Sequence, residues 1–188
     1  MIRQTFLFAT IMALVTPVAS ALEEPSWELL ETVGPVELRR YAPSIEARTA
    51  LASNGESSGG FQRLAGYIFG GNESGEKIAM TAPVAETLEG DNPVMSFTMP
   101  SAYDMTQLPE PNSSDITLHE TPERIVAALS FSGWATSGKV ARYQRQLLAT
   151  LDDNGISAKS APILHQYNPP WTPPFMRRNE VVVEVRLD

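Results

Sequence analysis

The chain has 188 residues, with 14 basic and 22 acidic side chains and a formal net charge of −8 at pH 7. This acidic balance argues against a nucleic-acid partner, because such affinity comes largely from neutralising phosphates. It also argues against an anionic membrane surface as the main partner. Cysteine is absent, which excludes disulfides, a thiol nucleophile and thioether attachment of a cofactor.

The first 21 residues have the pattern of a secretory signal peptide. Arg3 gives a basic start, Phe6 to Val15 form an apolar run, and Ala19-Ser20-Ala21 is a small-residue cleavage site. We therefore expect export to the periplasm or the exterior, with one mature domain over residues 22–188. The alternative is an uncleaved membrane tether. No later segment is apolar enough over sufficient length to span a bilayer.

The first half of the mature chain alternates as strands and then forms a helix. Strands are predicted over 36–41, 45–51, 78–84 and 94–99, with a leading strand or turn over 27–32. One helical face is made by Phe61, Leu64, Ala65, Ile68 and Phe69. Ser57 or Ser58 would cap this helix, and Gly70-Gly71 would end it.

The second half repeats this order at a spacing of about 80 residues. Strands are predicted over 116–120, 125–131, 163–167 and 181–187, and a helix over 140–151 has Ser137 as its cap and Gly155 just past its end. An internal duplication follows. The predicted class is α+β, a distorted antiparallel β-barrel built from two similar halves, each with one packed α-helix.

Several common chemistries lack their residues. The stretch Gly70 to Lys77 looks like a phosphate loop, but Glu76 precedes the lysine and Ile78 follows it. Zinc needs three or four ligands, and the chain has two histidines and no cysteine. No Gly-x-Ser-x-Gly elbow supports a serine hydrolase. The sequence therefore favours binding over catalysis.

The segment Tyr167 to Phe175 concentrates prolines and aromatic residues. Because proline lacks a backbone donor, the segment predicts a stiff loop that holds Trp171 and Phe175 outward. We expect this loop to close over a concave apolar surface, where its rings would contact a flat ring system. The alternative is a loop that only covers the end of the barrel.

Charged and polar residues beside this loop extend the prediction. Arg177 or Arg178 would bind a carboxylate of the ligand, or would pair with Glu180 or another acidic side chain. A flat, apolar, acid-bearing ligand is most simply haem. His165, which shares a strand face with Ile163 and Tyr167, would then be an axial ligand to iron, or else a partly buried histidine bonded to backbone. His119 lies on the polar face of its strand.

Three sequence blocks together resemble the SOUL haem-binding family. They are VELRRYAPSIEAR, YIFGGNESGEKIAMTAPV and QYNPPWTPPFMRRNEVVVEV, and the resemblance extends over roughly residues 33–185. It implies a duplicated, distorted antiparallel barrel with two helices, and non-covalent binding of haem or another tetrapyrrole in an apolar groove. It places the ligand near Phe61, Leu64 and Ile68 and near Trp171, Phe175 and Arg177.

Two alternatives remain beside an exported tetrapyrrole-binding module. One is an enzyme that removes the metal from a tetrapyrrole or modifies its ring, for which His165, Tyr167 or Glu180 would supply a proton. The other is a domain that binds a different hydrophobic ligand or a protein, because an acidic chain does not attract a dicarboxylate.

Overall fold

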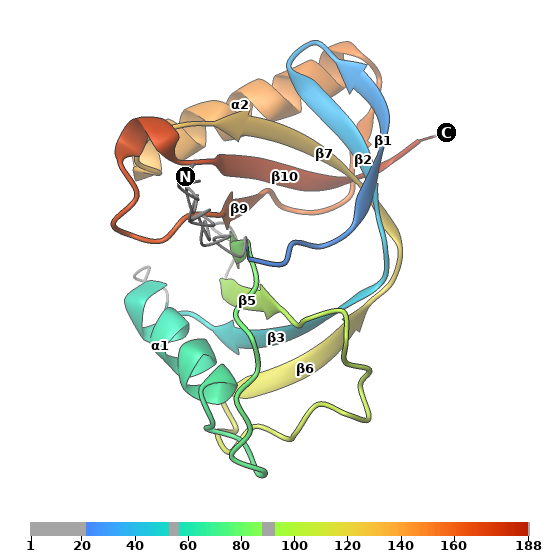
Figure 1. Ribbon diagram of the computed structural model, residues 1–188. Helices are drawn as coiled ribbons and strands as arrows, with labels where there is room; N and C mark the ends of the chain where they lie inside the picture. Colours follow the sequence, from blue (N-terminus) through green and yellow to red (C-terminus); the bar gives the residue numbers. More distant parts are fainter. Residues whose placement is uncertain (1–21, 53–56, 88–92, 188) are drawn as a thin grey trace, which may run out of the picture.

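The computed structural model describes residues 22–52, 57–87 and 93–187, which form a curled antiparallel sheet with two helices (Figure 1). The strands are β1 (Trp27–Val33), β2 (Val36–Tyr41), β3 (Ser44–Ala50), β4 (Val84–Thr87), β5 (Val94–Thr98), β6 (Ile116–Thr121), β7 (Arg124–Phe131), β8 (Ser157–Ala158), β9 (Ile163–Gln166) and β10 (Asn179–Arg186). The helices are α1 (Ser57–Ile68) and α2 (Ser137–Asp153), and a 3-10 turn, η1, covers Pro174–Met176. The predicted α+β class is confirmed. The predicted signal segment lies outside the described residues.

The predicted duplication is present in the order of the elements. The series β2, β3, α1, β4, β5 is repeated as β6, β7, α2, β9, β10, with the short β8 inserted. The sheet order is β1-β2-β7-β10-β9-β4-β5-β3-β6, and β8 pairs with β10. Without β1 and β8, this order is symmetric about the β9–β4 pair. The first strand of each repeat therefore lies in the sheet of the other repeat, which the sequence did not predict.

Two prolines create this exchange of strands. Pro43 separates β2 from β3, and Pro122 separates β6 from β7. Since proline cannot donate to a ladder, each strand pair ends at its proline and the chain continues into the other half. Figure 1 shows the two resulting ribbons on the right of the view, joining the upper half to the lower half. The β4–β9 pairing makes a third connection.

Each half has its own apolar layer between the sheet and one helix. The α2 layer contains Leu38, Leu129, Leu147, Leu164 and Val183, and the α1 layer contains Ala47, Leu64, Ile68, Met95 and Phe97. Successive strand residues point to opposite faces of a sheet. Residues that alternate with these, such as Arg39, Glu46 and His165, consequently face the inner side, between the two halves.

The inner surface of the curled sheet carries charged side chains among apolar ones, and the expectation of a concave apolar surface under the aromatic loop stays a prediction. The hollow between the halves is lined by residues such as Glu46, Arg48, Arg124 and His165. The physical reason is the two-residue period of a strand. Most apolar residues of the strands face the helices, and charged residues together with Val126, Ile163 and Val182 line the inside.

Two local predictions also differ from the structure. The predicted strand over 78–84 begins only at Val84. Before it, Ile78 donates its amide to the carbonyl of Ile68, at the end of α1, and Ala82 donates to the carbonyl of Glu23. These amides therefore donate to carbonyls outside the sheet ladder, and β4 begins only after them.

The ends of α2 differ in how well they were predicted. The N-cap is Thr136 rather than Ser137, and its side chain makes no capping hydrogen bond. At the other end, Gly155 has a φ of 69° as expected for a residue just past a helix. In the described ranges, neither helix has the length and apolarity needed to cross a membrane.

Adjacent leucines in α2 test this packing. Leu147 is fully buried against the sheet, whereas Leu148 is 37 % exposed. We expect Leu147→Ala to lower the free energy of unfolding by about 2–5 kcal/mol because it leaves a cavity, and Leu148→Ala to lower it by less than about 1 kcal/mol. Urea unfolding followed by circular dichroism measures both. Equal losses would show that α2 does not pack as described.

Candidate functional site

The loop over residues 168–178, called here the aromatic loop, is held in shape by one arginine. Arg177 donates from Nε to the carbonyl of Thr172 at 2.9 Å and from Nη2 to the carbonyl of Pro170. The amide of Gly133 donates to the carbonyl of Pro174 at 2.8 Å, which ties the loop to the segment before α2. Since prolines limit its backbone freedom as well, the loop has little conformational entropy left to lose. The predicted stiffness is consistent with these contacts.

The aromatic loop exposes large apolar side chains. Trp171 is 83 % exposed, Phe175 is 80 % exposed and Met176 is 62 % exposed. Beside them, the half-exposed ring of Trp134 lies 3.9 Å from the guanidinium carbon of Arg177. Soluble proteins rarely leave several large apolar side chains on one rigid segment without a binding role. This surface, composed of Trp134, Trp171, Phe175 and Met176, is the candidate site.

The two arginines of the loop have different positions. Arg177 is buried, and its guanidinium is occupied by the loop carbonyls. Arg178 stacks on Tyr167 at 3.5 Å and forms an ion pair with Glu24 at 2.5 Å, with nearly half of its side chain exposed. An exposed pair of this kind contributes little to stability and can exchange partners. Arg178 is therefore the arginine available to a ligand carboxylate.

The α1 residues named with the loop do not adjoin it in the structure. Leu64 and Ile68 are fully buried in the α1 layer, where they offer no surface to a ligand. Phe61 is 42 % exposed and packs edge-on against Phe97, with ring centroids 5.4 Å apart. Figure 1 shows α1 in the lower half of the molecule and the aromatic loop in the upper half. Phe61 is thus the member of this group that a ligand can reach.

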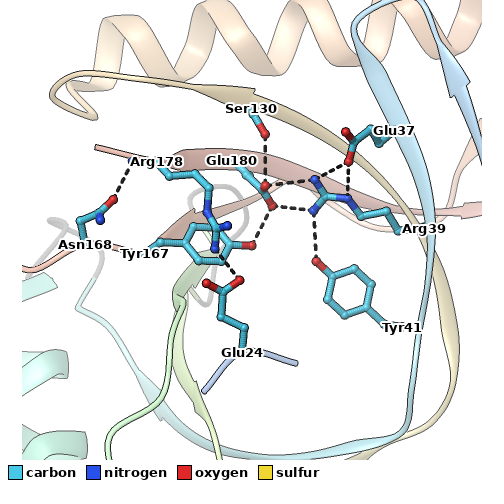
Figure 2. A network of polar contacts seen from close by, with 9 residues as sticks. All are labelled: Glu24, Glu37, Arg39, Tyr41, Ser130, Tyr167, Asn168, Arg178 and Glu180. Carbon is cyan, nitrogen blue, oxygen red and sulfur yellow. Dashed lines mark hydrogen bonds and ion pairs between the residues drawn. The ribbon is translucent and has the colours of Figure 1, made fainter. Parts of the chain in front are cut away.

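Behind the loop, a buried network is centred on Glu180 (Figure 2). Arg39 forms a bidentate ion pair with this carboxylate, with N–O distances of 2.8 and 3.1 Å. Tyr167 donates to it at 2.7 Å and Ser130 at 3.1 Å. Arg39 also contacts Glu37, at 2.8 Å. The two side chains of the central pair are only 5 % and 3 % exposed.

Burial and charge fix the protonation states of this network. Burial raises the pKa of Glu180, but hydrogen bonding and the charge of Arg39 outweigh this effect and hold it below its usual value. Burial lowers the pKa of Arg39, and Glu180 more than compensates. Burial, followed by the charge of Glu180, raises the pKa of Tyr167 well above its usual value. Glu180 is consequently ionised and Tyr167 protonated at neutral pH, which makes neither a ready general acid or base.

His165 is buried on the inner face of β9, where it lines a hollow of about 160 Å³. Burial lowers the pKa of its imidazole to about 4, so it is neutral at pH 7. The centroid of the His165 ring lies 6.3 Å from the centroid of the Tyr167 ring, and the two rings meet edge to face. The second histidine, His119, is exposed as predicted, and its Nε2 lies 2.8 Å from the hydroxyl of Thr117.

A larger hollow of about 710 Å³ lies where the chain enters the fold, and its lining includes Glu23, Glu24, Glu120 and Glu123. Its lining includes no basic side chain, so it does not favour an acidic ligand. Among the described residues, no group of three or more histidine, aspartate or glutamate side chains is placed to hold a metal ion.

The residue that sequence reasoning missed is Arg39. The signal was present in Val36-Glu37-Leu38-Arg39-Arg40-Tyr41, since alternation puts Glu37, Arg39 and Tyr41 on one face opposite Val36 and Leu38. Which acidic residue would meet Arg39 depends on the neighbouring strands β7 and β10, which no local pattern specifies.

Sequence comparison finds a family model and two relatives that are similar to this chain. The family model described as SOUL heme-binding protein matches residues 22–184. Heme-binding protein 2 of Mus musculus is 32 % identical over 181 residues, which cover 86 % of this chain and 85 % of that protein. Heme-binding protein 2 of Homo sapiens is 32 % identical over 151 residues, which cover 73 % of each chain.

Solved structures with far lower identity share the architecture. The EcmrR C-terminal domain superposes with a TM-score of 0.60 at 11 % identity and covers 81 % of this chain and 98 % of that one. An uncharacterized conserved protein from Listeria innocua gives 0.58 at 10 % identity, covering 89 % and 94 %. These likenesses concern the fold alone.

The central ion pair has a clear mutational signature. Glu180→Gln leaves Arg39 buried without its counter-charge, and we expect it to lower the free energy of unfolding by about 3–5 kcal/mol. The double variant Arg39→Met with Glu180→Leu should lose less than the single variant, because no buried charge is left unpaired and Glu37, the other partner of Arg39, is 40 % exposed. Urea unfolding of Glu180→Leu, Arg39→Met and the double variant completes the cycle.

The exposed pair of Arg40 with Glu28, at 3.0 Å, provides the control. Arg40→Ala should change the free energy of unfolding by about 1 kcal/mol or less. Additive losses in the Arg39 and Glu180 cycle would contradict the pairing described above.

Proposed function

Because this chain belongs to the SOUL family of haem-binding proteins, we propose that it is an exported protein that binds haem non-covalently through its aromatic loop. The supporting observation is the exposure of Trp171 and Phe175 on a rigid loop whose shape does not depend on their burial. The chain has no cysteine, so thioether attachment is impossible, which supports non-covalent binding.

The aromatic loop suits the chemistry of haem better than the two hollows do. Haem is flat and apolar with two carboxylate arms, and it binds by stacking on rings and by pairing its carboxylates with arginine. Trp171 and Phe175 supply rings and Arg178 supplies an exposed guanidinium. The 160 Å³ hollow is smaller than the roughly 300–1,000 Å³ of ligand pockets. The 710 Å³ hollow has an acidic lining, which repels carboxylates.

Binding through the aromatic loop does not require a side chain of this protein to ligate the haem iron. His165 remains a predicted iron ligand, but its imidazole lies in the small hollow, and the inner face of the sheet would have to open for haem to reach it. When bound, haem would supply redox and gas-binding chemistry of its own. Trp171 and Phe175 would contact the ring of haem, and Arg178 would pair with one of its carboxylate arms.

Loss of the loop rings should weaken haem binding. Titration of haem into the purified protein should give a saturable Soret shift at one haem per chain. We expect Trp171→Ala to weaken affinity by about fivefold or more, corresponding to about 1 kcal/mol of lost stacking, and Phe175→Ala to act in the same direction. The matched control is Phe69→Ala, which removes an aromatic ring that is 63 % exposed and lies outside the loop.

Two results would refute this assignment. Equal weakening by Phe69→Ala would indicate nonspecific adsorption to exposed rings. Unchanged affinity in the double variant Trp171→Ala with Phe175→Ala would place haem elsewhere on the protein, and the absorption spectrum of His165→Ala would then show whether the inner face binds it.

Export rests on the signal-like pattern of the first 21 residues. Expression of the full chain in a bacterial host should yield a periplasmic protein whose N-terminal residue is Leu22. Fractionation and intact-mass measurement test this directly. Ala21→Arg places a large charged residue at the cleavage position and should leave the precursor uncut; recovery of full-length protein in the cytosol from the unaltered chain would contradict export.

A further inference from the structure

The hollow between the two halves contains unusual unsatisfied polar atoms. It measures about 160 Å³, and His165 and Arg124 both contribute to its lining. Within the described residues, three buried side-chain nitrogen or oxygen atoms lack a hydrogen-bond partner. Two of these three are Nδ1 of His165 and Nη1 of Arg124. Since burying a polar group without a partner costs about 1–3 kcal/mol, two such atoms on one small hollow indicate a site for a ligand.

We propose that this hollow, called here the inner cavity, binds a small carboxylate. Nη1 of Arg124 is a donor in every protonation state. Nδ1 of His165 is a donor in one of the two neutral tautomers. Two donors on one cavity suit an acceptor with two oxygens, which a carboxylate provides. His165 is 9 % exposed, so a ligand in the cavity would reach its Nδ1 away from the bulk solvent.

Two guanidinium groups and two carboxylates line the inner cavity. Glu46 is shared by two guanidinium groups, with Arg48 at 3.1 Å and Arg124 at 3.3 Å. Glu184, also in the lining, pairs with Lys159 at 3.6 Å, so these two charges cancel. His165 is neutral because of its burial. The four charged side chains of the lining balance one another, so the free donor of Arg124, and not a net charge, would hold an anion.

Size and wall chemistry define the ligand further. At about 30 Å³ per water molecule, the inner cavity holds about five non-hydrogen atoms. Val126, Ile163 and Val182 line it together with the polar groups and would contact a short alkyl chain. A carboxylate with two or three carbon atoms, such as propionate, matches this description. The same chemistry could come from a free short-chain acid or from the propionate arm of a larger molecule.

The two histidines make the experiment specific. The chain has only His119 and His165, so imidazole-labelled protein gives two sets of nitrogen signals in long-range proton–nitrogen NMR spectra. Propionate titration should shift the His165 signals saturably and fix its proton on Nδ1. The exposed His119 should remain unshifted and serves as the internal reference. Chloride at equal ionic strength and 1-propanol test whether charge alone or the alkyl chain alone is sufficient.

Variants connect the NMR shifts to the cavity. Arg124→Gln removes the free donor and should weaken propionate binding at least tenfold, whereas Arg40→Gln, at an exposed arginine outside the cavity, should leave it unchanged. Val126→Phe fills the cavity and should abolish binding. If Val126→Phe does not fold, Val182→Met fills less space and should still weaken binding tenfold.

The results decide between carboxylate binding and a solvated cavity. His165 signals that respond equally to chloride, propanol and propionate, or that do not respond at all, would overturn the proposal. Protein preloaded with haem distinguishes the sources: blocked propionate binding identifies a tetrapyrrole arm, and unchanged binding identifies a free acid. Haem affinity is read from the Soret band, so this proposal can fail while haem binding stands, and the reverse.

Discussion

The two-residue period of the strands is the constraint on which this structure depends. Each helix covers one face of the sheet, and most apolar residues of the central strands point to that face. In β2, Leu38 faces α2, so Arg39 has to face inward. A charged group on an inner face needs a partner, because unpaired burial is costly. The buried pair of Arg39 with Glu180 is therefore a consequence of covering the sheet with α2.

The exchange of first strands extends this logic to the whole molecule. Because β2 lies beside β7 and β6 lies beside β3, residues of both repeats meet on the inner face. Glu46 comes from the first repeat and Arg124 from the second, yet they form an ion pair at 3.3 Å. Arg39 and Glu180 likewise join strands separated by 141 residues. The duplicated fold thus brings complementary charges together without requiring the two repeats to carry the same residues.

Sequence patterns predicted the helices and strands well, but predicted the roles of individual side chains less well. Alternation and helical spacing located nearly all strands and both helices, because burial of one face requires apolar residues at a regular spacing. This spacing could not show whether Leu64 and Ile68 pack against the sheet or contact a ligand, since both require an apolar helix face. Arg177 was expected to bind a carboxylate or an acidic side chain, but loop carbonyls occupy it. That outcome depends on the folded path of the loop, which residue types alone do not specify.

The aromatic loop and the inner cavity differ in what they demand of the fold. The loop rings are already exposed and their supporting arginine is already satisfied, so a flat ligand can bind there with little rearrangement. The inner cavity is enclosed by charged groups and contains unsatisfied atoms, so a ligand there would complete the interior and raise the stability of the folded state. Tyr167 connects the two regions, since it stacks under Arg178 of the loop and donates to Glu180 of the network. A carboxylate that draws Arg178 away from Tyr167 and Glu24 would therefore alter the outer edge of the network that surrounds Arg39, which is the physical route by which the loop and the interior can influence each other.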